Sequence, residues 1–284
     1  MEPWHHLPTP LGYQVPVWWQ PAEVPARGAV LVVPALGTPA AVYRRFAGEL
    51  ARAGYAALVL ELRGYGQSKL RAGRRRDWGY AEMVTQDLPA ALLWLRDQAP
   101  GLPLVLAGHS LGGHLALAYA ALRPAAAAGV LLLACASPYV GYYTGAMGRR
   151  LRLGLQVMPS LISLLGYFPG NRVGFGGREA AGVMRDWLRL AREDRFAPAG
   201  LPVDLETRLA AYAGPVLSVS FRDDLLAPPA AVGSINRRLT SARLAKLELG
   251  ATELGCRAGH FNWTREPAGL TAQLMPWLTG LGKA

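Results

Sequence analysis

The chain has few cysteines and no hydrophobic run long enough to cross a membrane. Its two cysteines, Cys135 and Cys256, are too few for a disulfide scaffold or a zinc site. The longest apolar run, residues 125–136, has twelve residues, whereas a membrane span needs roughly 18. The first residues have neither the basic nor the apolar segment of a signal peptide. We therefore expect a soluble, cytoplasmic protein with no transmembrane segment.

Acidic residues are also scarce relative to basic ones. Thirty Lys and Arg against 19 Asp and Glu give a formal net charge of +11, and only three of the basic residues are lysines. A concentrated basic patch would indicate a nucleic-acid or anionic membrane-surface partner. Only Arg74, Arg75 and Arg76 form a tight cluster, and no module of alternating aromatic and basic residues accompanies it. We expect no nucleic-acid partner, and a general preference for arginine explains most of the charge.

Hydrophobic residues make up 51% of the chain and charged residues 17%, which excludes a disordered protein. Short apolar runs alternate with segments of helical period along most of the sequence. The predicted strands are residues 29–33, 56–60, 104–107, 130–134, 216–221 and 244–249. The predicted helices are residues 40–53, 80–98, 111–122, 228–239 and 267–278. This alternation predicts an α/β fold with a mostly parallel central sheet flanked by helices.

The alternation stops between residues 137 and 204, which contain several prolines and glycines and no clear buried strand. We expect a helical cap at residues 137–204, inserted into a core of residues 1–136 and 205–284. Insertions at the carboxyl ends of parallel strands often contribute to ligand binding. The apolar and aromatic residues that could line an acyl pocket there are Tyr142, Tyr143, Met147, Leu151, Leu155, Leu161, Leu164, Tyr167 and Phe168.

The sequence Gly108-His109-Ser110-Leu111-Gly112 lies between a predicted strand and a predicted helix. A Gly-x-Ser-x-Gly motif in this position is typical of a nucleophile elbow, in which a sharp turn exposes the serine hydroxyl. Side chains two positions before and after the serine would collide across such a turn, so glycines suit both places. We predict that Ser110 is a nucleophile and that the Leu111 N–H, at the helix start, stabilises an oxyanion.

A nucleophilic serine needs a histidine base, and the chain has five histidines. We expect His5 and His6 to lie in a mobile amino-terminal segment and His114 to be packed within a helix. His109 belongs to the elbow itself. His260 follows the last predicted strand, where the chain order Ser, acid, His of an elbow-containing fold puts the base. His260 is therefore the predicted base.

The acid that orients the base should end a strand between Ser110 and His260. Asp223 and Asp224 directly follow the strand predicted at residues 216–221, and either could orient His260 while the other caps a turn. A second oxyanion donor is expected in the turn after residues 29–33. Pro34 has no N–H to donate. We predict the N–H of Leu36, with Ala35 and Gly37 as alternatives.

These motifs resemble those of the α/β-hydrolase superfamily over nearly the whole chain. Besides the elbow, Glu61 to Ser68 is similar to the family segment Asp-x-Arg-Gly-x-Gly-x-Ser, with Glu61 in place of the usual Asp. The resemblance is strongest to the branch of esterases, monoacylglycerol lipases and serine aminopeptidases. The family spacing Asp-x-x-x-Pro falls on Asp224 and Pro228, which favours Asp224 as the acid. Residues 34–37 depart from the family's His-Gly-x-Gly.

The resemblance implies a serine hydrolase that cleaves carboxylic esters through a Ser110–His260–Asp224 triad and an acyl-enzyme, with Leu36 and Leu111 as the oxyanion hole. It implies no cofactor and no metal ion. The expected partner is a small-molecule ester with an apolar acyl group, and the oligomeric state is left open. An acyltransferase or thioesterase with the same triad, and a non-catalytic binding protein on this fold, are the alternatives.

Overall fold

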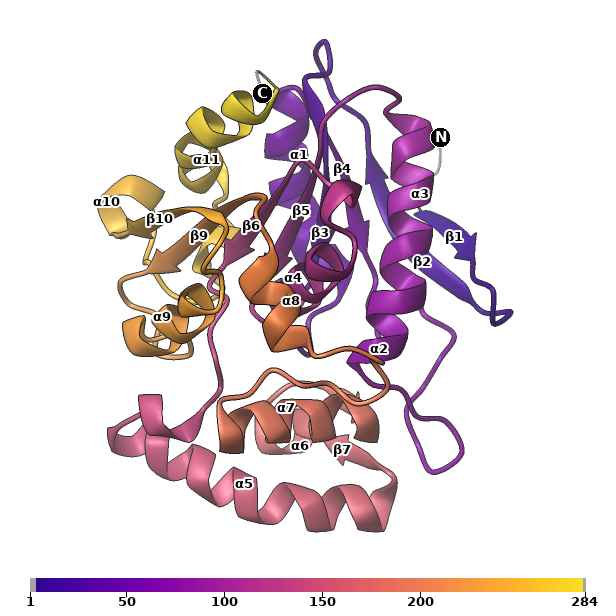
Figure 1. Cartoon of the computed structure of the whole chain (residues 1–284), viewed down its shortest axis with the longest axis vertical. Coiled ribbons are helices and arrows are strands. Elements are labelled where there is room, and N and C mark those ends of the chain that lie inside the picture. The colour runs from indigo at the N-terminus through magenta and orange to yellow at the C-terminus, as the bar shows by residue number, and fades with distance from the viewer. Residues whose placement is uncertain (1–3, 283–284) are drawn as a thin grey trace.

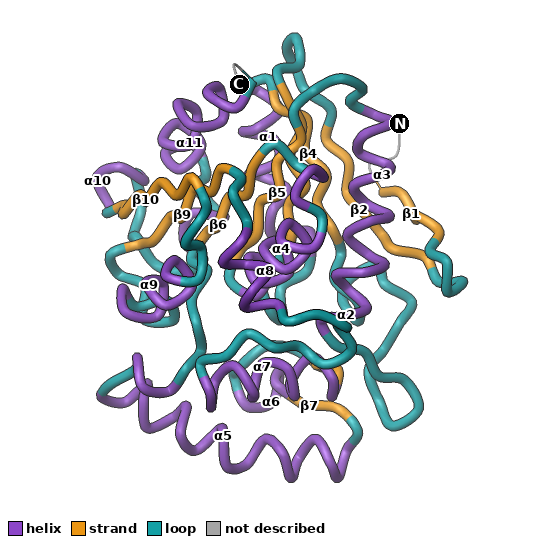
Figure 2. The backbone as a smooth tube through the Cα atoms, in the orientation of Figure 1, coloured by secondary structure: helices purple, strands orange, loops and turns teal. Residues whose placement is uncertain are grey.

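The computed structural model describes residues 4–282, which form one central sheet of eight strands with helices on both faces (Figures 1 and 2). The strand order is β1-β2-β4-β3-β5-β6-β9-β10. In this sheet β1 pairs antiparallel with β2, and β2 pairs antiparallel with β4. All other neighbouring strands are parallel. Their bounds are β1 Trp4–Pro8, β2 Gln14–Gln20, β3 Gly28–Val33, β4 Tyr55–Leu60, β5 Leu104–His109, β6 Gly129–Leu133, β9 Pro215–Phe221 and β10 Arg243–Leu249. This mostly parallel sheet confirms the predicted fold class.

Helices cover the sheet because its central strands are apolar on both faces. Every residue of β3, β4, β5 and β6 is buried. The bounds of the helices that flank them are α1 Arg44–Arg52, α2 Tyr80–Glu82, α3 Leu88–Gln98, α4 Leu111–Leu122, α8 Leu205–Ala211, α9 Pro229–Arg237, α10 Ala251–Leu254 and α11 Ala268–Leu281. The hydrophobic cluster beneath α3, α4 and α8 occupies one face, and the cluster beneath α1 and α11 occupies the other. Strands buried on two faces explain why the sequence shows continuous apolar runs there.

The amino-terminal segment forms β1 and β2, so the expectation that His5 and His6 are mobile is wrong. His5 lies in β1, where its ring stacks on Trp94 of α3 with the ring centroids 4.8 Å apart. The strands escaped prediction because β1 is mostly half-exposed and mixes histidines with a tryptophan, which gives neither a buried run nor a clear alternation.

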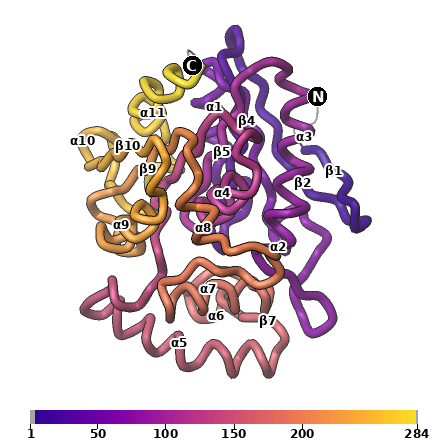
Figure 3. Tube along the Cα trace, in the orientation of Figure 1, coloured from indigo at the N-terminus to yellow at the C-terminus, as the bar shows by residue number. Residues whose placement is uncertain are grey.

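Between β6 and α8 the chain leaves the sheet, and this segment lies at one end of the molecule (Figure 3). Its helices and strands are α5 Gly145–Leu165, β7 Tyr167–Pro169, α6 Gly170–Val173, β8 Arg178–Ala180 and α7 Ala181–Glu193. The strands β7 and β8 pair as a short antiparallel ribbon that the sequence did not predict, since each has only three residues. The division into a core and a cap at residues 137–204 stays a prediction. No helix among residues 4–282 is long and apolar enough to span a bilayer.

Candidate active site

Ser110 occupies a strained turn between β5 and α4. Its backbone has φ 52° and ψ −117°, a combination that L-residues rarely adopt, and its N–H donates to the Leu133 carbonyl at 2.9 Å. A Cβ at Gly108 would lie 2.3 Å from the Gly112 carbonyl oxygen, which leaves no room for a side chain. The local geometry therefore has the sharp strand-to-helix turn that the motif predicts, and Ser110 lines a cavity.

Gly112 provides a direct test of this turn. A Cβ there would lie 2.1 Å from the Val33 carbonyl oxygen and 2.6 Å from that of Pro34, both of them backbone atoms. We expect Gly112→Ala to lower the unfolding free energy by about 3 kcal/mol, because overpacking a rigid site costs this much. Urea denaturation measures the effect. Gly280→Ala in α11, where no heavy atom lies within 4 Å of the added Cβ, is the matched control and should not destabilise. Equal losses in both variants would contradict the steric argument.

His260 and Asp224 form a hydrogen-bonded pair. Nδ1 of His260 lies 2.6 Å from Oδ2 of Asp224, which is 5% exposed. The other carboxylate oxygen, Oδ1, accepts the N–H groups of Leu226 at 2.8 Å and Ala227 at 3.1 Å. With its Nδ1–H donated to Asp224, a neutral His260 presents Nε2 as a proton acceptor.

Asp223, the alternative acid, is exposed, and the only hydrogen bond that it donates or accepts among residues 4–282 runs from its N–H to the Ala258 carbonyl at 2.9 Å. The structure therefore brings Asp224, and not Asp223, to His260. Ser110 and His260 line the same cavity, although no hydrogen bond joins their side chains in the described part of the chain. Catalytic hydrogen bonds are often long in the absence of substrate and tighten when it binds.

Two backbone N–H groups beside Ser110 are free to bind an anion. The N–H groups of Leu36 and Leu111 donate no hydrogen bond within residues 4–282, and both residues line the cavity. Of the alternatives, Ala35 donates its N–H to the Tyr43 hydroxyl at 2.9 Å, so that group is already occupied. Gly37 packs against Gly176, where a Cβ on Gly37 would come within 2.6 Å of the Gly176 Cα. These contacts favour Leu36 over Ala35.

Tyr43 connects the loop that contains Leu36 to the turn at Ser110, and no sequence pattern predicted this connection. Its buried hydroxyl accepts the Ala35 N–H and shares a hydrogen bond of 2.8 Å with Nδ1 of His109. Burial, assisted by the neighbouring His260, lowers the pKa of His109 well below its usual value, so the ring is neutral. Tyr43 therefore holds the loop and the residue that precedes Ser110 in fixed relation.

The cavity beside Ser110 has a volume of about 610 Å³ and is roofed by the segment between β6 and α8. The apolar residues that segment contributes include Met147, Leu151, Val157, Met158, Leu161, Phe168 and Trp187. Of the residues expected to line it, Tyr142, Leu155, Leu164 and Tyr167 do not. A cavity of this size and lining suits a small apolar molecule or acyl group.

His114 is a polar group in the wall of this cavity. Its Nε2 bonds to the Ala136 carbonyl at 3.0 Å, whereas Nδ1 has no partner among the described residues. Burial lowers the pKa of His114 to about 4, so the ring is neutral at pH 7. It is packed within α4 as expected, but its contribution to the cavity was not predicted.

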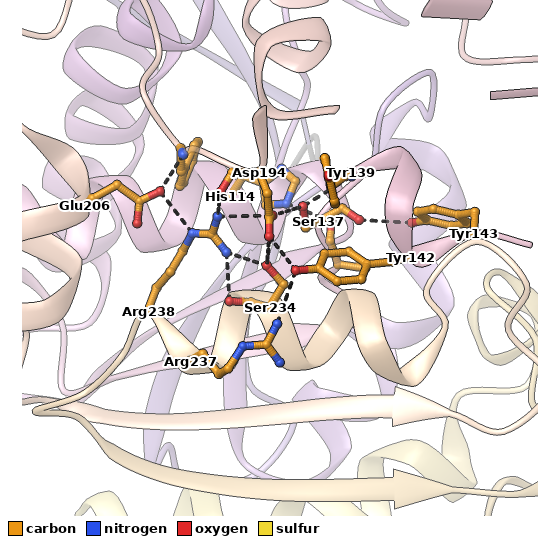
Figure 4. Close-up of polar contacts among 12 residues, drawn as sticks. His114, Ser137, Tyr139, Tyr142, Tyr143, Asp194, Glu206, Ser234, Arg237 and Arg238 are labelled. Atoms are coloured by element: carbon orange, nitrogen blue, oxygen red, sulfur yellow. Dashed lines mark hydrogen bonds and ion pairs between the residues drawn. The ribbon is translucent and has the colours of Figure 1, made fainter. Parts of the chain in front are cut away.

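Asp194, at the end of α7, holds both ends of the roofing segment against the core (Figure 4). Its carboxylate accepts the hydroxyls of Ser137 at 2.6 Å and Ser234 at 2.9 Å, together with that of Tyr142, and it pairs with Arg238 at 3.1 Å. Burial raises the pKa of Asp194, but these hydrogen bonds and the Arg238 charge outweigh it, so the pKa lies below its usual value. The charged carboxylate therefore fastens the start and end of the segment to α9.

A chain of hydrogen bonds connects the Asp194 anchor to Asp224. Tyr143, which follows Tyr142, donates its hydroxyl to the carbonyls of Ser137 at 3.1 Å and Leu226 at 3.0 Å. The N–H of Leu226 in turn bonds to Asp224. The position of the cavity roof is thereby linked to the turn that holds Asp224.

Comparisons with known proteins identify the family and agree with the fold. A family model described as serine aminopeptidase, S33, matches residues 24–173. A highly thermostable carboxyl esterase from Bacillus coagulans superposes with a TM-score of 0.69 at 16% identity, covering 98% of each chain. A putative non-heme bromoperoxidase from Mycobacterium tuberculosis gives 0.62 at 16% identity, covering 94% of this chain and 96% of that one. Structures this distant share the fold, and no curated protein matches the sequence.

Proposed function

Because the chain belongs to the serine aminopeptidase S33 family of α/β-hydrolases, we propose that it is a serine hydrolase that cleaves carboxylic esters. The observation that carries this proposal is the arrangement at one cavity: a serine in a strained turn and a histidine bound to a buried carboxylate. A serine that shares a cavity with an oriented imidazole is what acyl transfer requires.

In the proposed reaction, Ser110 Oγ attacks the acyl carbon while Nε2 of His260 takes the hydroxyl proton. Asp224 holds the imidazole with Nε2 facing the serine and stabilises the imidazolium that forms. The tetrahedral oxyanion lies between the free N–H groups of Leu36 and Leu111.

Collapse of the tetrahedral intermediate expels the alcohol, which takes its proton from His260. The product at this stage is an acyl-enzyme on Ser110. Water, deprotonated by His260, then attacks the acyl-enzyme and releases the carboxylic acid. No metal ion or organic cofactor has a role in these steps.

The apolar cavity favours an ester with an apolar acyl group. Its lining is mostly aliphatic and aromatic, and among residues 4–282 the only Arg, Lys, Asp or Glu that lines it is Arg150 on α5. Burial of each CH₂ contributes about 0.8 kcal/mol, so a longer acyl chain that still fits should lower KM.

A fluorophosphonate probe and an ester series test the proposal. We expect the probe to label the full-length protein at Ser110, located by peptide mass spectrometry, and Ser110→Ala to stay unlabelled. p-Nitrophenyl esters of increasing acyl length should be hydrolysed with rising kcat/KM until the cavity is filled. Absence of labelling together with absence of turnover would indicate a non-catalytic protein. Faster turnover of matched thioesters, or acyl transfer to an added alcohol in preference to water, would indicate the thioesterase or acyltransferase instead.

A further inference from the structure

Exposed apolar side chains gather around the opening of the cavity. Among the described residues, ten large hydrophobic side chains are exposed, and five of them also line this cavity. They are Leu153, Val157, Val173, Leu226 and Phe261, with exposures between 39% and 61%. A single exposed leucine is ordinary on a protein surface, but a group around one opening marks an interaction site.

The helix α5 extends this apolar surface outward. Leu153, Val157 and Leu164 lie within about 40° of one another around the helix, given about 100° per residue. Leu164 is 64% exposed and lies outside the cavity. The opposite side of α5 packs inward through Met158 and Ile162. Figure 1 shows α5 along the outer edge of the molecule, and all three side chains are exposed there.

Arginines without acidic partners surround the same surface. Arg149, Arg150 and Arg152 on α5 and Arg172 on α6 are exposed and form no ion pair among residues 4–282. Residues 98–178 contain no Asp or Glu at all. The positive potential over this part of the protein is therefore not neutralised locally.

The arginine cluster at residues 74–76 lies on this side too. The Arg74 guanidinium donates a hydrogen bond to the Leu164 carbonyl near the end of α5, and a Cβ on Gly166 would touch the Arg74 backbone. All three arginines are exposed and form no ion pair in the described part of the chain. The one tight basic cluster in the sequence thus adjoins the exposed apolar side chains.

We propose that this surface docks onto an anionic lipid bilayer, with the cavity opening toward it. The docking surface is made of the apolar side chains Leu153, Val157, Leu164 and Val173 and the seven arginines at positions 74–76, 149, 150, 152 and 172. A bilayer interface supplies acyl chains for the apolar residues and phosphate groups for the guanidinium groups.

The charges disfavour the other occupants. A second copy of the chain would bring two strongly basic surfaces together, and like charges repel. A nucleic acid would match the arginines but would leave the aliphatic side chains without an apolar partner. The proposal goes beyond ester cleavage and does not depend on it, because docking needs no reaction at Ser110.

Vesicle co-sedimentation tests the docking surface with the full chain carrying Ser110→Ala, so that no lipid is hydrolysed. We expect binding to vesicles of phosphatidylcholine and phosphatidylglycerol in equal parts, much weaker binding to phosphatidylcholine alone, and loss of binding at high salt. Each basic residue near an anionic surface strengthens binding about fivefold (about 1 kcal/mol). Adding Arg149→Ala and Arg152→Ala, which lie outside the cavity lining, should therefore lower partitioning about 30-fold.

Arg27→Ala with Arg123→Ala is the matched control. Both residues are exposed and precede the parallel strands β3 and β6, so they lie at the end of the sheet away from α5. This pair removes the same charge and should change partitioning less than twofold. Leu164→Ser should also weaken vesicle binding, because it removes an apolar contact without changing charge. In the active chain, the α5 variants should retain turnover of a water-soluble ester.

Three kinds of result would overturn the proposal. The first is a vesicle result: either the Ser110→Ala protein shows no preference for anionic vesicles, or the α5 pair and the control pair lose vesicle binding equally. The second is a dimer in the absence of lipid that Leu164→Ser converts to a monomer, which would assign the surface to a second copy. The third is RNA binding as tight as vesicle binding and unaffected by Leu164→Ser, which would indicate a general polyanion site.

Discussion

Replacing Ser110 with alanine should lower kcat on a p-nitrophenyl ester by on the order of 10⁵–10⁶-fold while leaving the fold intact. Without Oγ no acyl-enzyme can form, and only water attacking a bound ester remains. The residual rate should still exceed the uncatalysed one by about 10³–10⁴, because the N–H groups of Leu36 and Leu111 would continue to stabilise the oxyanion. Initial rates with both proteins under saturating substrate measure the effect.

Ser241→Ala is the control for this variant. Ser241 is exposed, precedes β10 and is absent from the cavity lining, so kcat should stay within about twofold. Circular dichroism and the urea midpoint should be unchanged in both variants. If Ser110→Ala turned over the ester at the parent rate, the nucleophile would have to be another group.

Replacing Asp224 with asparagine should lower kcat by about 10⁴-fold with little change in KM. The asparagine carbonyl would keep accepting the N–H groups of Leu226 and Ala227, which places its amide NH₂ toward His260. Nδ1 of His260 would then have to accept a hydrogen bond, and the proton would move to Nε2. In that tautomer the ring cannot take the Ser110 proton.

The neighbouring Asp223 gives a matched control. Asp223→Asn makes the same chemical change one residue away on an exposed side chain that does not contact His260. Its kcat should stay within about twofold of the parent value. A large loss in Asp223→Asn with a small one in Asp224→Asn would reverse the assignment of the acid.

Sequence patterns predicted the parts of the fold in which a single physical requirement, such as burial or steric exclusion, restricts the choice of residue. The strands β3, β4, β5 and β6 are buried on both faces, and such strands show as uninterrupted apolar runs. The turn at Ser110 was predictable because a side chain at Gly108 or Gly112 would collide with backbone. The strands β1 and β2 were missed because β1 has one buried residue and β2 has three, and both mix polar with aromatic side chains.

Contacts between distant segments could not be predicted from the sequence. Asp194 lies 57 residues from Ser137 and 40 from Ser234, and no local pattern indicates that one carboxylate binds both hydroxyls. The bond from Tyr43 to His109 spans 66 residues in the same way. Leu155 and Leu161 illustrate a related difficulty: both are aliphatic residues of α5, yet only Leu161 reaches the cavity. The side of α5 that faces the cavity depends on how the helix packs, and the hydrophobicity of its residues alone does not specify this packing. The roles assigned to Ser110, His260 and Asp224 stay predictions.

The attachment of the roofing segment at Asp194 bears on how such a protein can change specificity. Ser137 and Asp194 are bonded to each other, so the two ends of residues 137–194 meet at one point beside α9. Residues between such closely spaced anchors can be lengthened, shortened or exchanged at small entropic cost and without displacing β6 or β9. New ligand preferences could therefore evolve by replacing α5 and its neighbours as a module, while Ser110, His260 and Asp224 beneath keep their geometry.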